Sequence, residues 1–158
     1  MKKVKFLTVA AIIAALYVLF TLIARIFGLD SGVIQVRFSE ALCILTAFTP
    51  AAVPGLFVGC ILSNVIVGGA LWDIIFGSIA TLIGAAIGYA LRKIVWLVPL
   101  PTVISNALII PPVLMKVYGA EESFFFLFAT VGIGEIISAY VLGMLLYSAL
   151  KKTKIRFV

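Results

Sequence analysis

The chain has 158 residues, of which 65% are hydrophobic and only 11% are charged, and its mean hydropathy is +1.32. Because the surface of a soluble domain needs about a quarter charged residues, this composition excludes a soluble protein and predicts an all-α membrane protein. The length suits one integral membrane domain, residues 1–158, with about five or six spans of about 20 apolar residues each. Histidine is absent, and Cys43 and Cys60 have no CxxC spacing, so we expect no metal site and no Ser-His or Cys-His mechanism.

The distribution of charge predicts which helix ends face the cytoplasm. Nine of the twelve Lys and Arg residues form three clusters between the hydrophobic stretches, whereas Arg25, Arg37 and Lys116 lie at the opposite ends. Under the positive-inside rule both termini are then cytoplasmic, and the net charge of +6 needs no nucleic-acid partner. The clusters are Lys2, Lys3 and Lys5, then Arg92 and Lys93, then Lys151, Lys152, Lys154 and Arg156.

The hydrophobic pattern predicts a bundle of six transmembrane helices. Pro50 ends the second helix on the inside, Gly68 and Gly69 make an outer turn, and residues 118–123 form an outer loop. In chain order, we expect the helices at about residues 4–27, 39–49, 51–67, 72–92 and 95–117, and from 124 to the basic tail.

The stretch 35–40, Gln-Val-Arg-Phe-Ser-Glu, alternates polar and apolar side chains before the second helix. The convergence of Gln35, Arg37 and Glu40 favours a lid that carries hydrogen-bonding groups over a pocket. The alternative is an interfacial loop in which Arg37 pairs with lipid phosphate or with Glu40.

Trp72 and Asp73 open the fourth helix, and each has two interpretations. Asp73 is as well suited to complement the helix dipole, worth about 0.3–1 kcal/mol, as to contact a ligand. Trp72 is explained equally well as an interfacial anchor and as a platform for stacking.

Glu135 lies inside a hydrophobic helix, about 11 residues or roughly 16 Å from the outer end at Phe124. A carboxylate at that depth must face a partner or a water-filled cavity, or be protonated. Asn64 and Asn106 are expected in the outer half or the middle of the membrane, so the three groups together favour ligand contact. A purely structural Glu135 bonded to Asn106 is the alternative.

Small residues recur every four positions in the first and fourth helices. Such spacing lets another helix approach closely and drives association in lipid, where the hydrophobic effect cannot. Docking of a partner helix and packing within the chain both explain it. The residues concerned are Ala10, Ala11, Ala14 and Ala15, which form two overlapping ladders, and Gly84 and Gly88.

Three runs of residues carry a resemblance to a known family. They are residues 33–42 (VIQVRFSEAL), residues 48–56 (FTPAAVPGL) followed by Gly59 and Cys60, and residues 73–78 (DIIFGS). They resemble the QueT family of queuosine-precursor transporters, and the resemblance covers the whole chain. The alanine ladder at Ala10, Ala11, Ala14 and Ala15 resembles the patch by which substrate-binding components of this kind dock on a coupling subunit.

QueT proteins are substrate-binding (S) components of energy-coupling factor (ECF) transporters, so the resemblance implies a six-helix S-component fold in a prokaryotic cytoplasmic membrane. It implies uptake of a 7-deazaguanine base or nucleoside from outside, with a transmembrane coupling subunit and two ATPase subunits as partners. The chain contains no Gly-x-x-x-x-Gly-Lys-Ser/Thr loop. We therefore expect those partners to hydrolyse ATP, and no cofactor to bind this chain.

A guanine-like edge presents N–H donors beside a carbonyl acceptor, which suits a carboxylate together with an amide or guanidinium. An aminomethyl precursor adds a cation, which suits a second carboxylate such as Asp73. The expected substrate-binding residues are Gln35, Arg37, Glu40, Asn64, Trp72, Asp73, Asn106 and Glu135.

Other classes of function stay open. An S component for a vitamin such as thiamine or riboflavin would keep the fold and the ladder but would need other pocket residues. An intramembrane enzyme is disfavoured by the lack of histidine and of a Gly-x-Ser-x-Gly motif. A structural or assembly protein would explain the ladders but leave Glu135 without a role.

Overall fold

The computed structural model describes residues 2–30 and 34–153, and within them the chain has helices and no strands. Val33, Lys154 and Arg156, which figure in the sequence analysis, lie outside these residues. The elements are α1 (Lys2–Ile26), η1 (Phe38–Ala47), α2 (Ala52–Ile66), α3 (Leu71–Ala90), η2 (Val95–Leu97), α4 (Leu100–Val117), α5 (Phe124–Glu135), η3 (Ile136–Leu142) and α6 (Gly143–Lys152).

Length and composition separate these elements into two groups. Within the described residues, four stretches are long and apolar enough to cross a membrane: Lys3–Ile26, Leu71–Ala90, Val95–Val117 and Phe124–Lys152. The helices η1 and α2 are also apolar but shorter. The all-α fold predicted from the sequence is therefore confirmed, and length alone supports four crossings.

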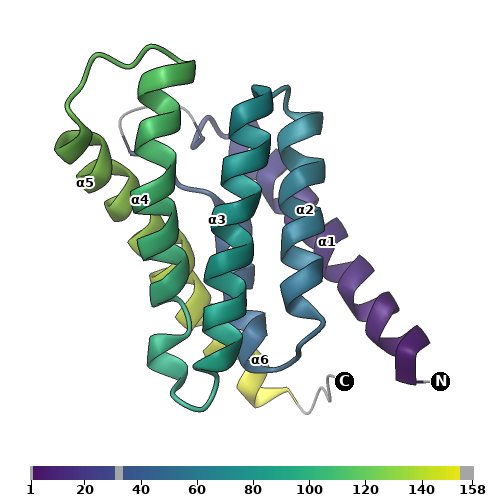
Figure 1. Cartoon of the computed structure of the whole chain (residues 1–158). Coiled ribbons are helices and arrows are strands. Elements are labelled where there is room, and N and C mark those ends of the chain that lie inside the picture. Colours follow the sequence, from purple (N-terminus) through teal and green to yellow (C-terminus); the bar gives the residue numbers. More distant parts are fainter. Residues whose placement is uncertain (1, 31–33, 154–158) are drawn as a thin grey trace.

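The bundle has two distinct ends, which can be followed in Figure 1. Helix α1 begins and α6 ends at the same end of the bundle, shared with the connection from α3 to α4 that carries Arg92 and Lys93. We call this the basic end. The turn between α2 and α3 and the loop after α4 lie at the opposite end, which we call the turn end.

The short helix η1 lies at the centre of the bundle. All residues from 39 to 46 are buried, and the helix packs against α1, α3, α6 and η3. It is a 3-10 helix of ten residues, although such helices are uncommon beyond three or four residues because their hydrogen bonds are strained. Contacts on every side, rather than local propensity, therefore hold this segment in place.

Glycines let the neighbouring helices touch backbone to backbone. A Cβ atom added to Gly59 of α2 would lie 2.7 Å from the Cβ of Tyr17 on α1. A Cβ added to Gly84 of α3 would lie 2.6 Å from the Cα of Thr102 on α4. In lipid, close approach of this kind replaces the hydrophobic effect as the force that holds helices together. The repeat of Gly84 and Gly88 therefore serves packing within the chain.

The structure separates the two alanine ladders of α1. Ala10 and Ala14 face α2, where the Ala10 carbonyl meets Gly55 and the Ala14 backbone meets Gly59, and Ala14 is only 6% exposed. Ala11 and Ala15 are exposed on the opposite side of the helix. Docking on the four alanines stays a prediction; Ala10 and Ala14 pack against α2, and Ala11 and Ala15 are the pair that is exposed.

Candidate functional site

A polar cavity of about 450 Å³ opens at the turn end of the bundle. Its walls come from the end of α1, the segment before η1, the α2–α3 turn and the end of α4. It combines two arginines and two aspartates with amide and hydroxyl groups, so it can hold a ligand that both donates and accepts hydrogen bonds. The lining residues are Thr21, Ala24, Arg25, Asp30, Gln35, Arg37, Asn64, Val67, Gly68, Gly69, Asp73, Leu114 and Tyr118.

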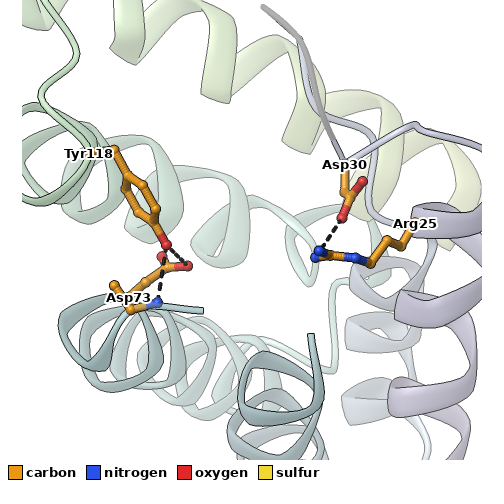
Figure 2. A network of polar contacts seen from close by, with 5 residues as sticks. Arg25, Asp30, Asp73 and Tyr118 are labelled. Carbon is orange, nitrogen blue, oxygen red and sulfur yellow. Dashed lines mark hydrogen bonds and ion pairs between the residues drawn. The ribbon is translucent and has the colours of Figure 1, made fainter. Parts of the chain in front are cut away.

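Two polar contacts stand on opposite sides of this cavity (Figure 2). The Tyr118 hydroxyl donates to Asp73 Oδ2 at 3.3 Å and accepts from the backbone N–H of Ala70 at 3.2 Å. On the other side, Arg25 Nη1 lies 3.6 Å from Asp30 Oδ2. Gly68 enables the turn beside them because its φ of 78° lies in the left-handed region that other residues rarely adopt. The Arg25–Asp30 ion pair and the Tyr118–Asp73 hydrogen bond therefore lie at opposite edges of the cavity.

The segment that carries Gln35 and Arg37 crosses the junction of α5 and η3 and contacts it through its backbone. The Arg37 backbone N–H donates to Ser138 Oγ at 2.9 Å. One turn earlier, a Cβ atom on Gly134 would lie 2.2 Å from the Gln35 carbonyl oxygen. This crossing lies where α5 gives way to the π-helix η3, and π-helical turns are often found at functional sites. The backbone contact with α5 and η3 thus sets the position of both cavity-lining side chains.

A buried group of acidic residues lies deeper in the bundle. Glu40 is 1% exposed, accepts a short hydrogen bond from the Tyr17 hydroxyl and accepts another from Cys43 Sγ at 3.4 Å. Glu135 is 7% exposed, and its Oε2 atom has no hydrogen-bond partner within the described residues. The Asn106 side chain lies within hydrogen-bonding reach of the same carboxyl group. One buried carboxylate oxygen is therefore left available.

Arg37 joins this acidic group to the cavity. Burial lowers the pKa of its guanidinium, but the surrounding groups reverse that effect and hold the pKa above its usual value. Arg37 therefore stays charged and balances the negative charge of carboxylates on its cavity side and on its buried side. The carboxylates among the surrounding groups, in order of effect, are Asp73, Glu40 and Glu135.

The eight residues expected to bind substrate fall into three places. Gln35, Arg37, Asn64 and Asp73 line the cavity. Glu40, Asn106 and Glu135 lie behind it in the buried acidic group.

Trp72 lies elsewhere, on the outer surface. It is 54% exposed and stacks on Phe76 with ring centroids 5.8 Å apart, outside the cavity. The interpretation as an interfacial anchor is therefore the one that its position favours.

Three further polar groups were not singled out in the sequence: Tyr17, Tyr118 and the Arg25–Asp30 pair. Tyr17 stands in an apolar run, where a tyrosine usually fills a core, and its hydroxyl was the available signal. The cysteines also do more than fill space, because Cys43 donates to Glu40 and Cys60 Sγ accepts from Thr81 Oγ1 at 3.4 Å. Within the described part of the chain, no group of three or more Cys, Asp or Glu side chains is placed to hold a metal ion.

Comparison with known proteins identifies the relatives of the chain. The family model described as the QueT transporter matches residues 7–152. The Queuosine precursor transporter QueT of Lactococcus lactis subsp. cremoris (strain MG1363) is 34% identical over 82 residues, which cover 51% of this chain and 47% of that protein. The match thus spans about half the length of that relative. No solved structure matches the chain. The resemblance to the QueT family is confirmed.

The close contact between Gly134 and the Gln35 carbonyl gives a prediction about stability. Gly134→Ala should lower the thermal unfolding midpoint in detergent, because the new methyl group meets the Gln35 carbonyl and overpacking of this kind costs about 1–3 kcal/mol. The control is Gly132→Ala in the same helix, whose Cβ would lie 3.8 Å from the nearest heavy atom, the Cβ of Ala107. That variant should be neutral or slightly stabilising, because alanine favours helix. Equal midpoints for the two variants would contradict the close contact.

Proposed function

Because the chain belongs to the QueT transporter family, we propose that it is the substrate-binding S component of an ECF importer that takes up queuosine precursors. The observation that carries the proposal is the polar cavity of about 450 Å³ at one end of an apolar helical bundle. Sites for small molecules have volumes of about 300–1,000 Å³ and a few well-placed polar groups. The substrate is suggested by the name of the relative and is compatible with the groups in the cavity.

The proposed orientation places the turn end outside the cell and the basic end in the cytoplasm of a prokaryote. The positive-inside rule supports it, because nine of the twelve cations belong to the three basic clusters. We propose six crossings, in which η1 and α2 form the second and third. Both are shorter than a full span, and a bilayer accommodates short helices by thinning or through neighbouring helices. An even number of crossings agrees with α1 beginning and α6 ending at the same end of the bundle (Figure 1).

The proposed recognition of a 7-deazaguanine uses the residues that reach the cavity. Arg37 would donate to the carbonyl of the base, and Asp73 would pair with the ammonium of an aminomethyl precursor, both as charge-assisted hydrogen bonds. Gln35 and Asn64 would supply amide contacts. Glu40 has both carboxylate oxygens engaged by Tyr17 and Cys43, so its proposed role is to hold Arg37.

Energy would come from other subunits. We propose that a transmembrane coupling subunit docks on the exposed face of α1 at Ala11 and Ala15 and that two ATPase subunits hydrolyse ATP, so that this chain itself binds no cofactor. The exposed small side chains support the docking, because they let a partner helix approach closely.

The proposed function is tested by thermal shift of the purified chain with a panel of ligands. A 7-deazaguanine should raise the unfolding midpoint, since any ligand that binds the folded state alone stabilises it by mass action. Stabilisation by thiamine or riboflavin, with none by deazapurines, would support the vitamin S component in its place.

The topology can be checked by labelling single cysteines in intact cells, in a variant that lacks Cys43 and Cys60. A cysteine at position 121 should react with a membrane-impermeant reagent added outside, and one at position 152 should not. Both positions are exposed, so access to solvent within the chain does not limit the reaction. Labelling at 152 without labelling at 121 would overturn the orientation.

The two alanine ladders give a matched pair of variants. Ala15→Trp should impair transport but leave ligand binding by the isolated chain intact, because the new side chain projects only toward a partner. Ala14→Trp should lower the stability of the isolated chain, because the backbone of Ala14 lies against Gly59. Transport assays and unfolding midpoints separate the two effects. Normal transport by Ala15→Trp would remove this face from the docking surface.

Two carboxylate variants test recognition. Asp73→Asn should weaken binding of 7-aminomethyl-7-deazaguanine at least tenfold, about 1.4 kcal/mol, and affect the 7-cyano form less, because only the aminomethyl group is a cation. Glu135→Gln keeps the shape and removes the charge behind Arg37, and should weaken both ligands at least tenfold. Isothermal titration measures the affinities, with Glu121→Gln, an exposed acid outside the cavity, as the control. Unchanged affinities in both variants would return these carboxylates to a structural role.

A further inference from the structure

A second hollow lies on the outer surface of the bundle, along the seam between α3 and α4. It has a volume of about 680 Å³ and is distinct from the polar cavity, since the two share no lining residue. We call it the α3–α4 groove. Lys116 is the one charged residue among those that line it. The lining residues are Trp72, Phe76, Ile79, Ile109, Pro112, Val113, Lys116 and Val117.

The groove lies along the part of the α3–α4 seam nearer the turn end. Toward the basic end, α3 and α4 touch at Gly84, where an added Cβ atom would lie 2.6 Å from the Cα of Thr102. Nearer the turn end, Trp72 and Phe76 of α3 and Pro112 of α4 line the groove.

The walls of the groove are apolar and preformed. The rings of Trp72 and Phe76 stack with centroids 5.8 Å apart and an interplanar angle of 21°, and both side chains are exposed. Val113, which is 5% exposed, lies beneath them as part of the floor. Because Leu71–Ala90 and Val95–Val117 are both candidate membrane spans, this surface faces hydrocarbon.

The polar end of the groove has the chemistry of a lipid headgroup site. Lys116 is exposed in the last turn of α4 and takes part in no ion pair with any described residue. Lysines at helix ends extend toward the interface, and tryptophans are enriched at the same depth. An ammonium above an apolar channel therefore complements a phosphate above an acyl chain.

We propose that the α3–α4 groove holds an acyl chain of an anionic phospholipid whose headgroup pairs with Lys116. An anionic lipid is favoured over a zwitterionic one, because the latter carries its own cation and offers Lys116 no net charge. The binding is independent of the substrate in the polar cavity.

Fluorescence of Trp72 provides the test. The chain has two tryptophans, so Trp96→Phe leaves Trp72 as the sole reporter. This variant is placed in two sets of phosphatidylcholine nanodiscs. One set contains brominated phosphatidylglycerol and the other contains brominated phosphatidylcholine at the same mole fractions, with the bromine near the glycerol end of the acyl chain in both. Bromine quenches tryptophan on contact, so the dependence of quenching on mole fraction gives the relative affinity of each lipid for the groove.

We expect an apparent affinity about fivefold higher for the brominated phosphatidylglycerol than for the brominated phosphatidylcholine, because one cation near an anionic headgroup contributes about 1 kcal/mol. Lys116→Gln should remove the difference, whereas Lys93→Gln, which changes the net charge equally at the basic end, should preserve it. Equal quenching by the two lipids, or equal effects of the two lysine variants, would overturn the proposal. Absence of quenching by either lipid would show that protein covers the groove, which would also overturn it.

Discussion

The buried hydrogen bond from Tyr17 to Glu40 ties η1 to α1, which itself packs closely against α2. Glu40 lies in the first turn of η1 and is almost completely buried, so its carboxylate must be paired or it would be expelled from the apolar interior. Tyr17 supplies the donor from α1, and the backbone around Tyr17 is held against α2 by Gly59. The position of η1 therefore depends on a polar contact that only a tightly packed α1–α2 pair can provide.

The position of η1 in turn determines the position of the cavity-lining residues that precede it. The residues just before η1 extend along the last helix, where Gly134 leaves room for the Gln35 carbonyl and Ser138 accepts from the Arg37 N–H. A backbone donor in an apolar bundle is costly when unpaired, so the Ser138 contact helps to hold the segment before η1 in place. The Arg37 side chain then stands between the buried carboxylates and the cavity. Packing of apolar helices thus determines where the charge of Arg37 meets the cavity.

Much of the fold could be predicted from the sequence because membrane helices leave a strong hydrophobic signal. The helices around residues 4–27, 72–92 and 95–117 correspond to α1, α3 and the η2–α4 stretch. The nature of η1 and η3 could not be predicted, because 3-10 and π geometry in these segments reflects contacts with neighbouring elements and not local propensity. The sequence also could not show which alanine ladder packs within the chain, because Ala14 and Ala15 are the same residue type and differ only in the direction in which they point from the helix.

The same limit applies to the candidate site. Residue type identified Arg37, Glu40, Asp73 and Glu135 correctly as polar groups that an apolar bundle must accommodate. Sequence could not say which of them reach the cavity, because depth and direction depend on how η1 is inserted between the long helices.

The ends of α3 and α4 show how one short stretch of helix can present side chains both to a polar cavity and to an apolar outer surface. On α3, Asp73 lines the polar cavity while the adjacent Trp72 lines the α3–α4 groove. On α4, Tyr118 reaches the cavity and Lys116 the groove. Successive residues of a helix point about 100° apart, so polar and membrane-facing roles alternate within a single turn. The Tyr118–Asp73 hydrogen bond ties the two helix ends together on the cavity side. The polar cavity and the α3–α4 groove therefore use different faces of the same two helix ends and share no lining residue.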